Sequence, residues 1–458
     1  MDIGGTEAWS SAFGIAALVV FVTAFGFVLA EEVTELRKSK PMVIAAGLVW
    51  ACVALALSGQ PGHGAQALLR DTLLEYAELF LFLLAAMTFV NTMEERRVFA
   101  VLRDRIVSRG FGFRATYWIL GGLSFVLSPV LDNLTTALVA GAVTTALGRD
   151  RRDFVVPTCV SVVVAANAGG AFSPFGDVTT LMVWQRGKIP FADFFALGLP
   201  SLVNWLVPAL CMLPAVPRGG LSSRAEGVTL KPAALAVMAL FALTIAATVL
   251  THQWLHLPSF LGMMTGLGAL QILGYFIRHR ELAEFAATPV VLDVPAGLKR
   301  ASKPFDVFVS MKRVEWDTLM FFYGVMLCVG GLGALGYLQL LSGASYGALG
   351  PTETNILVGI ASAIVDNIPI MFSVLSIDPQ MSEGQWLLVT LTAGVGGSLL
   401  SVGSAAGVAL MGQARGTYTF GAHLRWSWAI ALGYAASIWV HLLVNAERFA
   451  HGIGSVPP

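Results

Sequence analysis

The sequence Ser128-Pro-Val-Leu-Asp-Asn133 lies inside a long apolar segment and recurs, 234 residues later, as Ser362-Ala-Ile-Val-Asp-Asn367. Two further pairs of segments match in the same order, at offsets of 239 and 227 residues: Glu78-Leu-Phe-Leu-Phe-Leu with Asp317-Thr-Leu-Met-Phe-Phe, and Asn167-Ala-Gly-Gly-Ala-Phe-Ser-Pro-Phe-Gly-Asp177 with Gly394-Val-Gly-Gly-Ser-Leu-Leu-Ser-Val-Gly-Ser404. Two short matches alone could arise by chance. Three in one order indicate that the chain consists of two related halves.

The composition of the chain excludes most soluble classes. Of its 458 residues, 56% are hydrophobic and only 12% are charged, whereas a soluble domain carries about 25% charged residues. The lipid bilayer is therefore the expected solvent for its surface. The formal net charge is zero, so there is no basic field to attract nucleic acid. Because no zinc-binding spacing or phosphate-binding loop occurs, we expect no cofactor.

The apolar segments predict an all-α polytopic membrane protein. A spanning helix needs about 20 mainly apolar residues, and ten segments meet this length: 11–30, 41–59, 72–92, 154–185, 191–216, 232–251, 256–277, 314–333, 386–412 and 426–445. The segment 115–148 is too short for two crossings, which favours a re-entrant hairpin, and 353–376 is interpreted in the same way. The first ten residues contain no Lys or Arg, so no cleavable signal peptide is expected.

The positions of Lys and Arg predict the orientation of these spans. With the N-terminus outside, the cytoplasmic loops are 31–40, 93–114, 149–153, 217–231, 278–313 and 413–425. These loops contain every Lys and Arg of the chain except Arg70, Arg186, Lys188 and Arg448. Such an asymmetry sets the orientation, and both termini then lie in the periplasm. The basic stretch 94–109 is expected to lie along the cytoplasmic membrane surface.

The orientation gives the two halves opposite topologies. We expect an N-terminal repeat, 1–216, a cytoplasmic linker, 217–231, and a C-terminal repeat, 232–458. Each repeat has about five spans, a re-entrant hairpin (115–148 or 353–376) and a broken helix (154–185 or 386–412). Inverted repeats with interrupted helices are a recurring design of secondary transporters, which bind the substrate near the bilayer midplane.

Acidic residues inside the apolar segments are the first candidates for function. Asp132-Asn133 and Asp366-Asn367 lie in the two hairpins. Because an acid at mid-membrane is costly, such residues usually mark an ion or proton pathway, although each Asp could simply cap a helix. Glu78 and Asp317 lie near the starts of their spans in mirrored positions. They are candidates for a proton path, unless they are first-turn charges favoured by the helix dipole.

The broken helices offer a cluster of oxygen ligands. Glycines and Pro174 interrupt the first of them, and non-helical backbone at membrane depth is tolerated only where it is buried in protein or lines a cavity. Hard cations prefer oxygen ligands. The candidates in the two segments are Asn167, Ser173, Asp177, Thr179, Thr180, Ser398, Ser401 and Ser404. Ser404 stands where the first half has Asp177. Single serines and threonines also pack helices together, so that alternative stays open for each of them.

The motifs around Asp132-Asn133-Leu-Thr135, Asn167 to Thr180, Asp366-Asn367-Ile-Pro369 and Gly396 to Gly412 resemble those of the NhaD-type sodium/proton antiporters, and the resemblance covers nearly the whole chain. It implies exchange of cytoplasmic Na⁺ or Li⁺ for external H⁺ across the bacterial inner membrane, by a scaffold and a moving subdomain in a homodimer. By this resemblance the functional residues are Asp132, Asn133, Thr135, Asp177, Thr179, Thr180, Asp366, Asn367, Ser401 and Ser404.

An exchange mechanism follows from competition for the same oxygens. Desolvation raises the pKa of a buried carboxyl group, whereas a cation bound beside it favours the charged form and expels the proton. Asp132, Asp177 and Asp366 are the acids expected to couple the ions. The alternative is an anion or oxyanion carrier of the same superfamily, of arsenite or carboxylate type. An enzyme is not expected, because the hairpins contain no nucleophile with a nearby His or Lys base.

Overall fold

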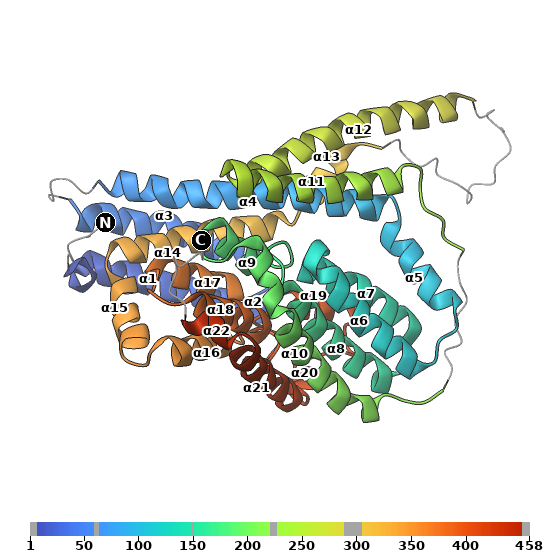
Figure 1. The fold of residues 1–458 in the computed structure, drawn as a ribbon. Coiled ribbons are helices and arrows are strands. Elements are labelled where there is room, and N and C mark those ends of the chain that lie inside the picture. Colours follow the sequence, from blue (N-terminus) through green and yellow to red (C-terminus); the bar gives the residue numbers. More distant parts are fainter. Residues whose placement is uncertain (1–6, 59–63, 149–150, 220–226, 288–304, 451–458) are drawn as a thin grey trace. The chain divides into compact units, whose positions relative to one another are not determined.

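The computed structural model describes residues 7–58, 64–148, 151–219, 227–287 and 305–450. Both chain ends, part of the expected linker 217–231 and part of the expected loop 278–313 lie outside the described residues. All the regular elements that the structure describes are helices (Figure 1). They divide into two compact units: unit 1 comprises residues 1–76, 105–225 and 317–458, and unit 2 comprises residues 77–104 and 226–316. Each unit therefore contains residues from both halves of the sequence.

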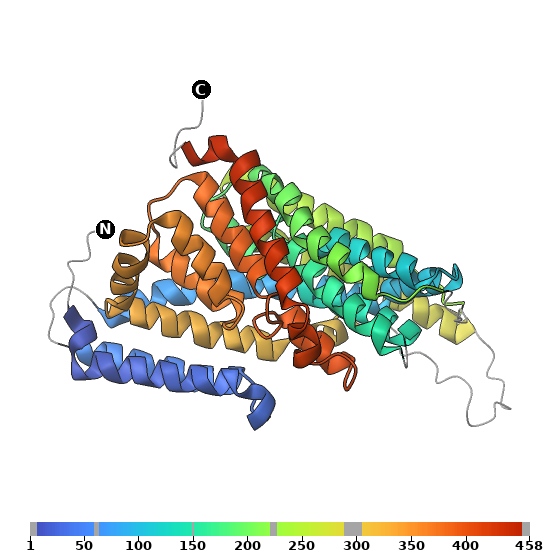
Figure 2. The same ribbon diagram turned by 90° about the horizontal axis from the view of Figure 1, so that it is seen from below.

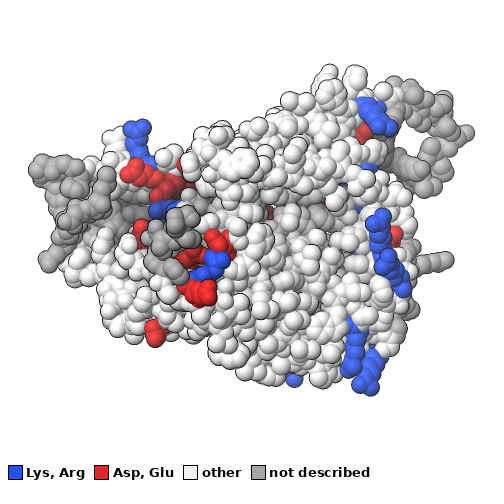
Figure 3. Space-filling view, viewed as in Figure 1, with Lys and Arg blue, Asp and Glu red and all other residues white. Residues whose placement is uncertain are grey.

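Nine helices among the described residues are long and apolar enough to cross a membrane: Ala12–Leu29, Ser39–Ala56, Ala65–Glu95, Arg152–Gly170, Phe191–Ala215, Ala234–Leu255, Ser259–Ala283, Trp316–Ala334 and Ser427–Val444. Large apolar side chains such as Trp254 and Ile44 are exposed on them. Uncharged residues cover most of the face in Figure 3. Contiguous apolar surface of this kind is rare on soluble monomers. The chain is a multi-pass helical membrane protein, as the composition predicted.

Unit 1 contains most of the helices. Its N-terminal helices are α1 (Ala12–Leu29), α2 (Glu31–Thr34), α3 (Ser39–Ala56) and the first part of α4 (Ala65–Glu95). The next group is α6 (Phe113–Leu131), α7 (Asn133–Gly148), α8 (Arg152–Gly170), α9 (Val178–Gln185) and α10 (Gly198–Met212). The last group is α14 (Trp316–Ala334), α15 (Tyr337–Ser342), α16 (Pro351–Ala361), α17 (Asn367–Ile377), α18 (Glu383–Gly396), α19 (Ala405–Gln413), α20 (Phe420–Leu424), α21 (Ser427–Val444) and α22 (Ala446–Ala450).

The core of unit 1 is built around α8. All of its residues from Phe154 to Gly169 and Gly170 are buried, and α8 packs against α6, α7, α10, α18 and α19. Figures 1 and 2 show α6, α7 and α8 side by side. The helix consists mainly of Val, Ala, Ser and Gly, and small residues of this kind let neighbouring helices approach closely within a membrane. The C-terminal end of α8 is thereby held at the centre of unit 1.

Equivalent contacts recur at positions related by the sequence offsets. Ser128 Oγ donates to the carbonyl oxygen of Ala166 at 2.6 Å, and Ser362 Oγ donates to that of Ala393 at 2.9 Å. Each serine lies four residues before the Asp-Asn pair of its half, and each carbonyl lies next to the first residue of the glycine-rich segment. The two bonds are therefore counterparts in the two halves.

The glycines of these segments repeat the same correspondence. A Cβ atom at Gly169 would collide with the carbonyl oxygen of Phe125, and one at Gly396 would collide with that of Gly359. These two pairs are again 227 and 234 residues apart. Because the backbones touch here, only glycine fits at either position.

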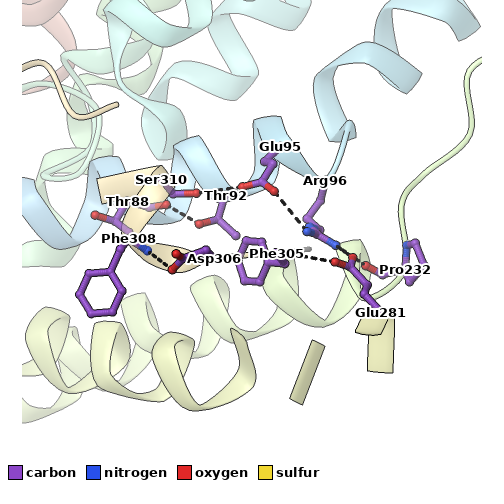
Figure 4. A network of polar contacts seen from close by, with 10 residues as sticks. All are labelled: Thr88, Thr92, Glu95, Arg96, Pro232, Glu281, Phe305, Asp306, Phe308 and Ser310. Atoms are coloured by element: carbon purple, nitrogen blue, oxygen red, sulfur yellow. Dashed lines mark hydrogen bonds and ion pairs between the residues drawn. The ribbon is translucent and has the colours of Figure 1, made fainter. Parts of the chain in front are cut away.

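Unit 2 comprises the end of α4, most of α5 (Val98–Ser108), α11 (Ala234–Leu255), α12 (Ser259–Ala287) and α13 (Val307–Lys312). A polar network joins these elements (Figure 4). Arg96 is 1% exposed and its guanidinium lies 2.7 Å from Glu281, 3.4 Å from Glu95 and 4.3 Å from the centre of the Phe305 ring. Glu281 also accepts a bond from the backbone N–H of Phe305 at 2.7 Å.

Two expectations about single residues are wrong. Arg96 does not lie on the membrane surface with the rest of 94–109, because two carboxylates and an aromatic ring provide a buried partner set for its charge. Glu78 does not lie near the start of its helix, because α4 begins at Ala65 rather than near residue 72 and Glu78 is half-buried in its interior. Asp317, in contrast, lies in the first turn of α14, as expected.

Candidate functional site

The break between α6 and α7 is formed by Asp132. Its backbone has a φ of 67°, a left-handed conformation that ends α6, and its half-buried carboxylate accepts bonds from the backbone N–H (2.8 Å) and hydroxyl (3.0 Å) of Thr135. An aspartate bonded to the N–H three residues later is a typical helix cap. The carboxylate is thus fixed at the start of α7, where the N-terminal end of the helix favours negative charge.

The end of α8 joins the two glycine-rich segments. Asn167 is buried, and its side-chain amide donates to Ser398 Oγ and Ser404 Oγ, both at 2.8 Å. Its amide oxygen accepts a bond of 3.1 Å from Asn133, the first residue of α7. One side chain therefore connects α7, α8 and the non-helical segment between α18 and α19. All four of these residues were predicted from the sequence as site residues.

Asp177 lies at the start of α9 and is buried, with 6% exposure. Its Oδ2 accepts a bond of 2.8 Å from the side-chain amide of Asn367, the first residue of α17. Its backbone N–H donates to Thr180 Oγ at 3.3 Å, and the Thr180 hydroxyl lies 2.8 Å from the carbonyl oxygen of Ser173. A carboxylate from the first half is thereby oriented by an amide from the second.

Two hydroxyl groups near these acids have no hydrogen-bond partner among the described residues. They belong to Thr179, two residues after Asp177, and to Thr136, one residue after Thr135, and both side chains are buried. A buried polar atom without a partner is unfavourable and needs an explanation. The oxygen-rich composition of this region, with carboxylate, amide and hydroxyl groups, fits a hard monovalent cation.

Asp366 lies at the start of α17, next to Asn367. Its Oδ1 accepts a long bond of 3.4 Å from the backbone N–H of Ile368, and its Oδ2 lies 3.4 Å from Lys38 Nζ. The adjacent Ser39 Oγ donates to Asp317 Oδ1. Lys38 and Ser39 were not predicted as site residues. Nothing in their local sequence indicates it, because their partners lie 328 and 278 residues away.

The second glycine-rich segment is supported by a buried chain of side chains. Ser401 has a φ of 67°, and its hydroxyl lies 3.3 Å from that of Tyr418. Tyr418 Oη is 2.7 Å from His423 Nδ1, and His423 Nε2 is 2.7 Å from the carbonyl oxygen of Ser398. Tyr418 and His423 are fully buried and were also missed. A buried tyrosine-histidine pair has no signature in the order of residues.

The structure thus collects nearly all of the predicted residues in one unit. The residues that lie in unit 1 are Asp132, Asn133, Thr135, Asn167, Ser173, Asp177, Thr179, Thr180, Asp317, Asp366, Asn367, Ser398, Ser401 and Ser404. Within it, printed bonds group them as Asp132 with Thr135, Asn133 with Asn167, Ser398 and Ser404, and Asp177 with Asn367. Glu78 belongs to unit 2.

Comparison with known proteins gives one consistent result. A model of the citrate transporter family matches residues 7–394. The chain is 53% identical to the Na⁺/H⁺ antiporter NhaD of Vibrio cholerae, over 96% of this chain and 93% of that protein. It is 51% identical to the NhaD of Alkalimonas amylolytica, over 96% and 92%, and 30% identical to sodium/proton antiporter 1 of Arabidopsis thaliana, over 95% and 73%. A transporter rather than an enzyme is confirmed, and the chain belongs to the citrate transporter family, within its NhaD-type Na⁺/H⁺ antiporters.

Proposed function

We propose that this chain exchanges cytoplasmic Na⁺ for external H⁺ across the bacterial inner membrane by alternating access. The observation that carries the proposal is the setting of Asp177. This carboxylate is buried at the start of α9, and an amide from α17 orients it. The high identity to curated Na⁺/H⁺ antiporters over nearly the full length of the chain supports the same conclusion.

Exchange arises because a proton and Na⁺ need the same oxygen atoms. Without a cation, burial favours the neutral carboxylic acid, and a cation beside the carboxylate favours the ionised form. Loading of Na⁺ therefore releases the proton, and protonation on the other side of the membrane releases Na⁺. Asp177 is the central acid, and Thr179 supplies a buried hydroxyl oxygen that has no partner among the described residues.

The remaining candidates form the surroundings of this carboxylate. The proposed cation ligands are Asp132, Asn133, Thr135, Asn167, Ser173, Asp177, Thr179, Thr180, Asp366, Asn367, Ser398, Ser401 and Ser404. Glu78 and Asp317 are proposed to take part in the proton path. The concentration of carboxylates argues against an anion as substrate, because like charges at one site repel each other.

Alternating access is supported by the matched contacts of the two halves. The Ser128–Ala166 and Ser362–Ala393 bonds are counterparts, as are the close approaches of Gly169 and Gly396. We propose that 1–216 and 232–458 are inverted repeats joined by the linker 217–231, each with its hairpin (115–148 or 353–376) and broken helix (154–185 or 386–412). Two such repeats can open the same site to either side in turn. Both termini are then periplasmic, Li⁺ is a second substrate, and the assembly is a homodimer.

Inverted membrane vesicles from a host without antiporters test the proposal directly. A respiratory proton gradient is established, and Na⁺, Li⁺, K⁺, citrate or arsenite is added in turn. We expect Na⁺ and Li⁺ to dissipate the gradient with the wild-type protein and Asp177→Asn to abolish this response at equal amounts of inserted protein. Asp153→Asn is the matched control, because Asp153 is half-exposed and pairs with Arg151 outside the site. Wild-type exchange in Asp177→Asn, or a response to citrate or arsenite alone, would overturn the proposal.

A further inference from the structure

Lys38 is a positive charge that already occupies one of the acids of the site. Its Nζ lies 3.4 Å from Asp366 Oδ2, and the two side chains are only 19% and 17% exposed. The same ammonium group lies 4.5 Å from the centre of the Phe321 ring. A cation over an aromatic face is attracted to it, so two independent contacts hold Lys38 in this place.

The chain around Lys38 is anchored by a second bond. The hydroxyl of Ser39 donates to Asp317 Oδ1, in the first turn of α14. Two successive residues at the start of α3 thus contact two acids of the second half of the sequence. This arrangement fixes the direction of the Lys38 side chain more firmly than a single surface ion pair would.

The partner of Lys38 lies directly beside the proposed coupling group. Asp366 is followed by Asn367, and the Asn367 amide donates to Asp177 Oδ2 at 2.8 Å. A cation that binds at Asp366 is therefore one residue away from the hydrogen-bond partner of Asp177. In the described structure the charge that fills this position is the lysine.

We infer that Lys38 is an internal competitor of the transported cation, which binds Asp366 when Na⁺ is absent and must leave it when Na⁺ binds. This inference rests on the proposed Na⁺/H⁺ exchange. An ammonium group and Na⁺ both carry one positive charge and both need the carboxylate oxygens. The free energy of the Lys38–Asp366 pair therefore opposes Na⁺ binding, and Lys38 sets the apparent affinity of the carrier for Na⁺.

The test compares the concentration of Na⁺ that gives half of the maximal response in Lys38→Gln, Lys38→Met, Lys38→Arg and wild-type vesicles. Removal of the charge frees Asp366, so we expect the half-saturating Na⁺ concentration to fall by about three- to tenfold in Lys38→Gln and Lys38→Met, the range that a partly buried ion pair supports. Lys38→Arg keeps the charge and should stay close to wild type.

Lys40→Gln is the matched control. Lys40 is exposed on the same segment, so its loss changes the local surface charge equally without touching Asp366. We expect its half-saturating Na⁺ concentration to equal that of the wild type. An equal fall in Lys40→Gln would show an effect of surface potential and overturn the inference, as would an unchanged or increased value in Lys38→Gln and Lys38→Met.

A second measurement does not depend on transport. The thermal stability of the purified protein is titrated with NaCl against choline chloride at constant ionic strength. In Lys38→Gln and Lys38→Met, the Na⁺-dependent stabilisation should reach its midpoint at a lower concentration than in the wild type. If Lys38 were only a structural tether, the variants would be less stable at every Na⁺ concentration with the same midpoint. Failure of the wild type to respond to Na⁺ in either assay would instead remove the proposed function itself.

Discussion

Asn367 at the start of α17 donates a hydrogen bond of 2.8 Å to Asp177 at the start of α9, across 190 positions of the sequence. Each residue begins a helix, and each belongs to the Asp-bearing motif of a different half. A neutral amide can serve both the charged and the protonated carboxyl group, because the hydrogen bond it donates suits either form. The contact is thus a direct link between the two halves at the acid most central to the proposed exchange.

Asn367→Ala removes this link and should lower both activity and stability. The buried carboxylate of Asp177 loses a partner, which costs about 1–3 kcal/mol, and its orientation is no longer fixed. We expect a lower thermal unfolding temperature in detergent and a loss of Na⁺-driven proton movement in vesicles. Asn204→Ala is the control, because Asn204 is a buried asparagine on α10 bonded to Ser437. That variant should lose stability yet keep the wild-type half-saturating Na⁺ concentration; a matching kinetic defect there would argue against a special role for Asn367.

Asn167→Leu should destabilise the protein through the groups it leaves behind. Asn133, Ser398 and Ser404 all bond to the Asn167 side chain, and each buried polar group left without a partner costs about 1–3 kcal/mol. Replacing a second member by an apolar residue removes one of these penalties. The double variant Asn167→Leu/Ser404→Ala is therefore expected to unfold at a higher temperature than Asn167→Leu alone. If the two substitutions instead add their losses, Asn167 and Ser404 do not act as a pair.

Gly396→Ala and Gly169→Ala should both prevent close packing of the glycine-rich segments. The new Cβ atom would overlap the carbonyl oxygen of Gly359 or of Phe125, and overpacking of this kind costs about 1–3 kcal/mol or more. We expect little monodisperse protein on size-exclusion chromatography from either variant. Gly47→Ala serves for comparison, since a Cβ atom meets nothing within 4 Å at this position inside α3. It should be neutral or raise stability by about 0.5–1 kcal/mol; equal damage at all three positions would contradict the packing argument.

Arg96→Met should weaken unit 2 in the absence of any effect on ion selectivity. The substitution leaves the Glu281 carboxylate partly buried beside Phe305 without its guanidinium partner, and breaking a buried ion pair from one side costs about 3–5 kcal/mol. Limited proteolysis and thermal unfolding measure the loss. Arg97→Met removes an exposed arginine at the next position and should change stability little. Retention of wild-type stability in Arg96→Met would show that the network of Figure 4 contributes nothing to the fold.

The two wrong expectations show where sequence patterns reach their limit. Arg96 belongs to a basic stretch whose pattern is typical of a membrane surface, but its charge is satisfied by Glu281, 185 residues away. The start of α4 was placed near residue 72 because Arg70 and Asp71 interrupt the apolar pattern. The helix nevertheless extends back to Ala65, since charged residues are good helix formers beyond the apolar part of a span.

The sequence by itself determined the class of the protein, the positions of its spans, the breaks in α8–α9 and α18–α19, and the candidate acids. These features are local: twenty apolar residues require a membrane, and glycine and proline interrupt a helix wherever they stand. Only the tertiary structure decided which distant groups meet, such as Asn367 with Asp177, Lys38 with Asp366 and Arg96 with Glu281. Such pairs depend on how whole helices pack, because a side chain finds its partner in space rather than at any fixed spacing along the chain.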